Sequence, residues 1–289
     1  MAKFQLDKSF SQPERVLLVG VMLAADFSGA NEIRERSFQA ALAEAAELVL
    51  AAGGELVQTE TAKRERAHSA LFVGTGKADE LAAIVRQQEI ELVVFNHELT
   101  PTQERNLEKV LQCRVLDRVG LILAIFAQRA QSQEGKLQVE LAQLTHLASR
   151  LVRGYGHLQS QKGGIGLKGP GETQLETDRR LINVKITALK RQLQAVEKQR
   201  ATRRKARQNS ALKTFALVGY TNTGKSSLFN RLTKADVLAK DQLFATLDTT
   251  ARRLYLSAEC SVILTDTVGF VRDLPHGLVA AFSATLEET

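Results

Sequence analysis

Apolar positions in the first 126 residues fall into short runs separated by longer amphipathic stretches. RVLLVGVML (15–23) and ELVVFN (91–96) are rich in valine and leucine, which predicts two buried strands. A shorter strand is expected at LFVG (71–74). Strands that alternate with helices predict an α/β domain with a parallel or mostly parallel sheet over residues 1–126.

Helices are predicted between and after these strands. An alanine-rich stretch that begins at Phe38 ends at Gly53 and Gly54, and glycine commonly ends a helix. A second helix is expected near 77–88. TPTQERNLEKVL (100–111) begins with a capping threonine followed by proline, which is a typical helix start.

Two stretches within residues 127–212 repeat apolar residues at helical spacing. Their apolar positions step alternately by four and three residues, so each set forms one narrow stripe along a helix. The two stripes comprise Leu137, Leu141, Leu144, Ala148 and Leu151, and Ile182, Ile186, Leu189, Leu193 and Val196. Matching stripes joined by one loop predict an antiparallel coiled coil, a hairpin whose loop is held away from both flanking domains.

The hairpin loop, residues 154–171, holds seven of the nineteen glycines of the chain. Residues 150–207 carry fifteen basic and four acidic side chains, whereas the rest of the chain carries 24 basic and 28 acidic ones. This concentration of positive charge is typical of a nucleic-acid partner, and ring side chains suit stacking on unpaired bases. A disordered tip is the alternative. The predicted RNA contacts are Arg150, Arg153, Tyr155, His157, Lys162, Lys168, Arg179 and Arg180.

The third segment, residues 213–289, begins with the strand FALVG (215–219) and then matches G-x-x-x-x-G-K-[ST] before a helix. Backbone N–H groups of such a loop converge on the phosphates of a nucleotide. We expect Lys225 to reach the β- and γ-phosphates and the Ser226 hydroxyl to bind Mg²⁺. The predicted phosphate loop comprises Gly219, Tyr220, Thr221, Asn222, Thr223, Gly224, Lys225 and Ser226.

Two further motifs have the order found in a GTPase switch. VILTDTVGF places Asp266 and Gly269 after an apolar strand, where Asp266 is expected to bind Mg²⁺ through water and the Gly269 N–H to face the γ-phosphate. FATLDTT offers Thr246 as a Mg²⁺ ligand that binds only when a γ-phosphate is present. Lys225, Thr246 and Gly269 are the predicted catalytic residues. Further predicted nucleotide contacts are Phe244, Ala245, Leu247, Asp248, Thr267 and Val268.

Together with KGGIGLKGPGETQLETDRR (162–180), the motifs at 219–226, 244–248 and 266–270 closely resemble the HflX family of ribosome-associated GTPases. The resemblance covers essentially the whole chain, and the 162–180 segment is its most specific part. It implies GTP as substrate and a cytoplasmic GTPase that binds the large (50S) ribosomal subunit. It further implies that the glycine-rich loop reaches rRNA near the peptidyl transferase centre and that stalled or idle ribosomes are split, notably under heat stress.

The chain departs from the family pattern at several positions. Thr249 stands where the family commonly has proline, and Ser227 where it commonly has threonine; neither is a predicted metal ligand. Phe270 occupies the position of the water-positioning glutamine of many GTPases, so we expect slow hydrolysis that a bound partner accelerates. No N-K-x-D segment precedes the end at Thr289, so about half of the G-domain sheet is expected to be missing. Guanine specificity is therefore implied by the resemblance alone.

Two other functions fit parts of the sequence. One is an RNA- or ribosome-binding regulatory module without useful nucleotide turnover. The other is an ATP-driven rRNA remodeller that uses the N-terminal domain, where VGTGK (73–77) precedes a helix and suggests either an anion cradle or a plain helix-start turn. No run of eighteen apolar residues occurs, which predicts no membrane span. Cys113 and Cys260 are expected to be reduced thiols, and we expect a monomer.

Overall fold

The computed structural model describes residues 13–25, 31–153, 170–208, 213–234, 243–244, 250–257 and 260–271. The chain divides into two compact units. The first unit comprises Met1–Ile125 with Ser149–Leu175, and the second comprises Phe126–Ala148 with Glu176–Thr289. The fifth helix of the chain therefore belongs to both units.

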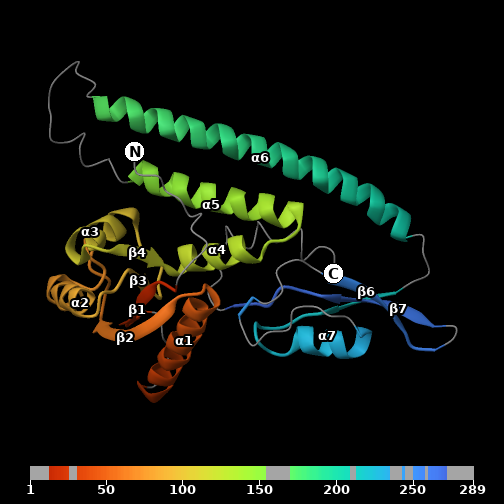
Figure 1. The fold of residues 1–289 in the computed structure, drawn as a ribbon, viewed down its shortest axis with the longest axis horizontal. Helices are drawn as coiled ribbons and strands as arrows, with labels where there is room; N and C mark the ends of the chain where they lie inside the picture. Colours follow the sequence, from red (N-terminus) through yellow and green to blue (C-terminus); the bar gives the residue numbers. More distant parts are fainter. Residues whose placement is uncertain are drawn as a thin grey trace. The chain divides into compact units, whose positions relative to one another are not determined.

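The first unit is built on a four-stranded parallel sheet in the order β2-β1-β3-β4 (Figure 1). Its strands are β1 (Arg15–Leu23), β2 (Glu55–Arg64), β3 (Leu92–Phe95) and β4 (Arg114–Asp117). The two predicted apolar strands are β1 and β3, which lie side by side at the centre and are almost entirely buried. The parallel α/β arrangement predicted from the alternation of elements is thus confirmed.

Three helices of the first unit connect these strands: α1 (Asn31–Ala51), α2 (Thr75–Gln87) and α3 (Pro101–Leu111). The start of α3 is fixed by a capping box. The Thr100 hydroxyl accepts a hydrogen bond from the Gln103 N–H, and the Gln103 side chain accepts one from the Thr100 N–H. The predicted cap at Thr100 is therefore confirmed.

The strand predicted at LFVG is wrong, because these residues form a turn. His68 and Phe72 exchange backbone hydrogen bonds of 2.8 and 2.9 Å, and Phe72 has a left-handed φ of 60°. The His68 ring also accepts hydrogen bonds from the Ala70 and Leu71 N–H groups. These local bonds replace the strand pairing, while Leu71, Phe72 and Val73 remain buried in the core of the first unit.

Three helices follow the sheet: α4 (Arg118–Arg129), α5 (Gln133–Arg153) and α6 (Pro170–Gln208). The two predicted hairpin helices are α5 and α6, and Figure 1 shows α6 as one long continuous helix. Leu189 and Leu193 of the predicted α6 stripe are buried. Antiparallel coiled-coil pairing of α5 with α6 stays a prediction.

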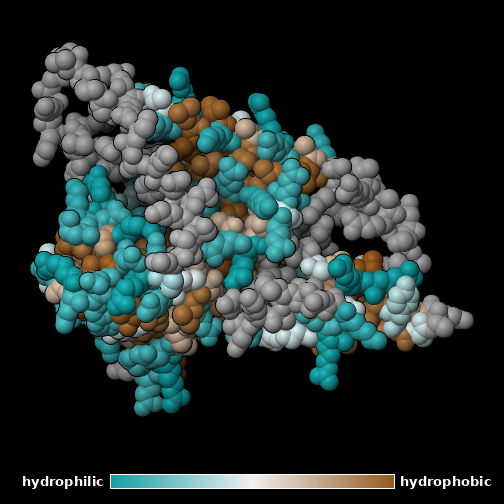
Figure 2. Space-filling view, viewed as in Figure 1, coloured by the Kyte–Doolittle hydropathy of each residue, from teal (hydrophilic) through white to brown (hydrophobic). Residues whose placement is uncertain are grey.

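Apolar side chains also reach the surface of α6. Leu181 is 53% exposed and Val184 is 61% exposed, and Figure 2 shows brown, apolar atoms over this helix. Within the described residues, no helix combines the length and the low polarity that a membrane crossing requires.

The second unit contains a three-stranded sheet in the order β5-β7-β6. It is formed by β5 (Thr214–Leu217), β6 (Thr250–Tyr255) and β7 (Ser261–Asp266), and α7 (Lys225–Thr233) follows β5. Strand β7 pairs with β5 in parallel and with β6 in antiparallel orientation. The carboxyl ends of β5 and β7 consequently meet at one edge of the sheet, where both predicted nucleotide motifs begin.

Candidate nucleotide-binding site

The predicted phosphate loop joins β5 to α7, as the sequence motif requires. Gly224 is the N-cap residue of α7 and has a φ of 82°, a left-handed conformation that a side chain disfavours. Lys225 is the first residue of the helix. The loop N–H groups therefore lie at a helix N-terminus, where the helix dipole favours an anion such as phosphate.

Two side chains of the loop bind its own backbone. The Thr223 hydroxyl donates a hydrogen bond of 2.8 Å to the Tyr220 carbonyl, and the Lys225 ammonium donates to the same oxygen. Burial lowers the pKa of Lys225, while the negative charge of Asp266 acts in the opposite direction. The loop thus holds Lys225 against its own backbone, beside the expected position of the phosphates.

Ser226 and Asp266 form the link between the two motifs. The Ser226 hydroxyl donates a hydrogen bond of 2.6 Å to Oδ2 of Asp266, which is completely buried at the end of β7. A hydroxyl oxygen and a carboxylate oxygen at this separation are hard donors of the kind that Mg²⁺ prefers. These two predicted metal ligands therefore fit the ion.

The D-x-x-G segment also pairs with the phosphate loop through its backbone. The Phe270 N–H donates to the Gly219 carbonyl at 3.0 Å, and the Phe270 carbonyl accepts from the Thr221 N–H at 2.8 Å. A Cβ at Gly269 would lie 2.6 Å from Cα of Thr221, so only glycine fits. The Thr267 hydroxyl donates to the Leu217 carbonyl at 2.7 Å. This pairing was not anticipated from the sequence, which gives no signal for it beyond the conformational freedom of glycine.

The predicted switch segment is described only at its start. Phe244 is buried and packs edge-on against Phe126 of α4, with ring centroids 4.7 Å apart. This is an apolar packing contact, and the prediction that Phe244 touches nucleotide stays untested. Four other predicted contacts lie outside the described residues: Ala245, Thr246, Leu247 and Asp248.

The predicted RNA contacts divide into three groups. Arg179 and Arg180 are exposed on α6, as an RNA contact requires. Tyr155, His157, Lys162 and Lys168 lie outside the described residues, and of Arg153 only the backbone in α5 is described. Arg150 differs, because its side chain is only 13% exposed and pairs with Glu104 and Asp117. A guanidinium engaged in this way is not presented to RNA, so the prediction that Arg150 contacts RNA is corrected.

Residues of the glycine turn at 73–77 in the first unit bind other groups of the protein. The Lys77 ammonium lies 2.7 Å from Glu60 and 2.9 Å from Glu80. Beside the turn, Nη1 of Arg64 donates to the Val73 carbonyl. These contacts favour the helix-start turn over an anion cradle.

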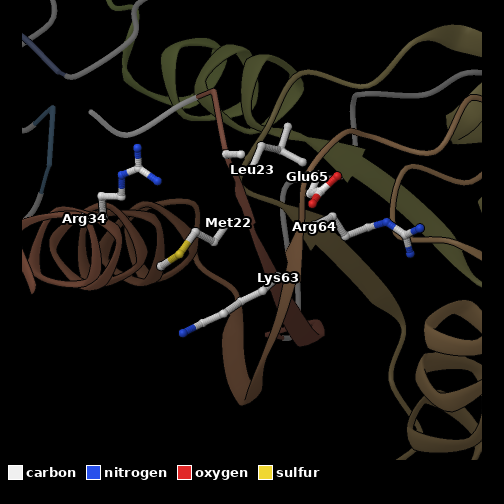
Figure 3. A pocket seen from close by; sticks show the side chains of 7 residues that line it. Met22, Leu23, Arg34, Lys63, Arg64 and Glu65 are labelled. Atoms are coloured by element: carbon white, nitrogen blue, oxygen red, sulfur yellow. The ribbon is translucent and has the colours of Figure 1, made fainter. Parts of the chain in front are cut away.

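A pocket of about 300 Å³ lies at the carboxyl ends of β1 and β2. Figure 3 shows that the Arg64 side chain extends away from the side chains of Arg34 and Lys63. Lys63 pairs with Glu35 at 2.9 Å. Lys63 and Arg64, two of the three basic residues that line the pocket, thus bind Glu35 and the Val73 carbonyl. The lining comprises Met22, Leu23, Ala24, Arg34, Lys63, Arg64 and Glu65.

A phosphate loop between a strand and a helix, with a serine–aspartate pair at its mouth, defines a P-loop nucleotide-binding domain. Three family models match consecutive parts of the chain. Residues 39–127 match "GTP-binding GTPase N-terminal", residues 129–207 match "GTP-binding GTPase Middle Region", and residues 214–289 match "50S ribosome-binding GTPase". The chain belongs to the HflX family of GTPases.

Several relatives are similar over most of this chain. GTPase HflX of Escherichia coli (strain K12) is 59% identical over 242 residues, which are 84% of this chain and 57% of the relative. GTPase HflX of Magnetococcus marinus is 54% identical over 86% of this chain and 58% of the relative. GTPase HflX of Alkalihalophilus pseudofirmus is 50% identical over 95% of this chain and 63% of the relative. The chain thus spans between 57% and 63% of the length of these three relatives.

Solved structures share the fold. A crystal structure of SsGBP with GDP superposes with a TM-score of 0.54 at 23% identity, covering 95% of this chain and 68% of that chain. A GTP-binding protein from Sulfolobus solfataricus in complex with GDP gives a TM-score of 0.50 at 22% identity, covering 95% of this chain and 67% of that chain. At this identity the likeness concerns the fold alone.

Proposed function

We propose that this chain is part of a Mg²⁺-dependent GTPase that binds the large ribosomal subunit through its basic hairpin and splits stalled or idle ribosomes. The proposal is carried by the hydrogen bond between Ser226 of the phosphate loop and Asp266 of the D-x-x-G motif. It is supported by relatives named GTPase HflX and by the family model described as a 50S ribosome-binding GTPase.

The proposed chemistry uses groups that the two motifs bring together. The N–H groups at the start of α7 bind phosphate oxygens, and Lys225 adds a point charge at the β- and γ-phosphates. Ser226 and Asp266 hold Mg²⁺, which when bound offsets the charge on the phosphate oxygens. Thr246 is the third proposed Mg²⁺ ligand, which would bind only when a γ-phosphate is present, and the Gly269 N–H is proposed to face the γ-phosphate.

Hydrolysis by this site alone is proposed to be slow. Phe270 has no polar side-chain group to orient water, and its backbone is already paired with the phosphate loop. The attacking water must therefore be positioned by other groups, and a bound partner is the proposed source of the acceleration. We therefore propose that hydrolysis is coupled to ribosome binding.

The proposed RNA surface includes α6 and the glycine-rich loop before it. Between Arg179 and Lys198 the helix is roughly 28 Å long, which is enough to follow several phosphates of an RNA helix. Its basic side chains in this stretch are exposed, as contact with a polyanion requires. They are Arg179, Arg180, Lys185, Lys190, Arg191 and Lys198.

One experiment tests the proposed surface directly. In the full-length protein, residues 154–171 are replaced with a short Gly-Ser turn, and sedimentation with purified large subunits is measured across a salt series. We expect weaker association with unchanged nucleotide affinity, because the phosphate loop lies in another part of the chain. Subunit binding and ribosome splitting equal to those of the unmodified protein would show that the segment is a passive linker.

A further inference from the structure

Arg150 lies in a cluster of ion pairs at the edge of the first sheet. Asp117, at the end of β4, is only 1% exposed and accepts a hydrogen bond of 2.6 Å from Nη2 of Arg150. Glu104 of α3 pairs with Nη1 of the same guanidinium. One arginine therefore joins the end of α5 to two separate elements of the N-terminal domain.

The backbone holds Asp117 in place for this contact. Its Oδ1 accepts a hydrogen bond from the Gly120 N–H at 2.8 Å, and its Oδ2 accepts one from the Leu99 N–H at 3.3 Å. Burial raises the pKa of Asp117 and lowers the pKa of Arg150. A planar guanidinium suits two acceptors on different elements, whereas a lysine ammonium has no such fork.

The position of Arg150 in the sequence gives this cluster a role beyond packing. Arg150 comes four residues before Gly154, where the glycine-rich segment begins. Arg153, the last described residue of α5, follows Arg150 by less than one helical turn, so the described end of the helix lies close to α3 and β4. The end of α5, with residues 149–175, also groups with the first unit and not with the rest of the helix.

We propose that Arg150 is a positioning residue for ribosome binding, which acts through Glu104 and Asp117 to fix where the glycine-rich segment leaves the N-terminal domain. The inference rests on the proposed function, in which that segment contacts rRNA. Arg150 makes no RNA contact itself in this account. By fixing the end of α5 from which the segment continues, it lowers the ordering cost that binding would otherwise incur.

Substitution of Glu104 distinguishes two roles for this residue, because they predict opposite changes in the affinity for large subunits. If Glu104 were only an acidic group near RNA, Glu104→Gln would remove a repulsive charge and strengthen binding. If it holds Arg150, the same change leaves Asp117 as the remaining acidic partner of the guanidinium, loosens the end of α5 and weakens binding, by about fivefold or more for a coupled site. Arg150→Lys keeps the charge and loses the fork, so it should weaken binding likewise. Arg114→Gln, which breaks an exposed pair with Glu14 in the same domain, is the matched control.

The test measures the affinity of each full-length variant for purified large subunits, with thermal unfolding and GTP affinity as checks on folding. We expect Glu104→Gln and Arg150→Lys to bind more weakly than Arg114→Gln. In the protein with residues 154–171 replaced, Glu104→Gln should cause no further loss, because the cluster acts through that segment.

Three outcomes overturn the inference. These are tighter or unchanged binding by Glu104→Gln, unchanged binding by Arg150→Lys, or an equal loss in the loop-replaced background. If replacement of the loop alone leaves binding intact, the proposed function fails as well. If replacement weakens binding and Glu104→Gln does not, only the positioning role fails.

Discussion

Ser226 and Asp266 lie 40 residues apart in the chain, and their side chains meet in a hydrogen bond of 2.6 Å. The serine starts a helix and the aspartate ends a buried strand, so the contact joins the phosphate loop to the D-x-x-G motif. Because β5 and β7 are parallel neighbours, their carboxyl ends bring these oxygens together. The two oxygens belong to the proposed Mg²⁺ ligands of the candidate site.

Asp266→Ala should abolish the Mg²⁺ dependence of guanine-nucleotide binding. The change removes the buried carboxylate and leaves Ser226 as the only ligand that the two motifs bring together. Binding of a fluorescent GTP analogue to the full-length protein, with Mg²⁺ and with a chelator, measures the effect. Ser227→Ala, which removes a hydroxyl one residue from the proposed ligand, should keep the dependence. A normal Mg²⁺ response in Asp266→Ala would remove Asp266 from the metal site.

Lys225→Ala should abolish detectable nucleotide binding by the full-length protein, because it removes the point charge from the β- and γ-phosphates. Lys234→Ala, at the other end of the same helix, is the matched control and should bind nucleotide normally. Titration with a fluorescent guanine nucleotide compares the two. Wild-type affinity in the Lys225 variant would refute the phosphate-loop assignment.

Gly269→Ala should disturb both stability and turnover. The new Cβ would lie 2.6 Å from Cα of Thr221, a backbone atom that cannot move without displacing the phosphate loop. We expect a loss of about 1–3 kcal/mol in the free energy of unfolding, the usual cost of overpacking, together with slower GTP hydrolysis. Gly76→Ala, where a Cβ meets nothing within 4 Å, controls for the added methyl group. Unchanged stability and hydrolysis in Gly269→Ala would show that the two segments are not packed this way.

Lys77→Met should lower the free energy of unfolding by about 1–2 kcal/mol at neutral pH and leave nucleotide binding unchanged. Burial opposes ionisation of Glu60, yet hydrogen bonds from Lys77 and Gln58 lower its pKa below the ordinary 4.5. Burial likewise opposes the charge of Lys77, yet its hydrogen bonds to Glu60 and Glu80 raise its pKa above 10.5.

The sign of the pH dependence follows from these directions. A carboxyl with a lowered pKa in the folded state stabilises the protein above pH 4.5 and loses this contribution as the pH falls. An ammonium with a raised pKa loses its contribution as the pH rises above 10.5. The difference between wild type and Lys77→Met should therefore be largest between these values and shrink at both extremes. A difference that is constant with pH, or a loss of nucleotide affinity, would contradict the ion-pair role.

Elements with strong local signals were predictable from the sequence. The apolar runs gave β1 and β3, and the Thr-Pro start gave α3, because burial and capping depend on residues close together in the chain. Strand β2 (ELVQTETAKR) was not predicted, because it is an edge strand with mostly polar residues. Strand β4 is four residues long, which is too short for a periodic signal.

Among the predicted site residues, too, some positions were predictable from the sequence and others were not. The phosphate loop and Asp266 follow from motifs with fixed spacing, so their positions were predictable. The place of Arg150 was not, because its partner Asp117 lies 33 residues away and Glu104 lies on another helix. Sequence charge alone cannot distinguish a basic side chain that faces RNA from one that is paired inside a domain.

We propose that the glycine-rich segment couples ribosome binding to GTP hydrolysis at the Ser226–Asp266 site. The most direct test measures GTP hydrolysis by the full-length protein as purified large subunits are titrated in, with and without replacement of residues 154–171. We predict slow hydrolysis by both proteins alone, strong stimulation of the unmodified protein, and little stimulation of the loop-replaced one. Equal stimulation of both proteins, or none of the unmodified protein, would contradict the account.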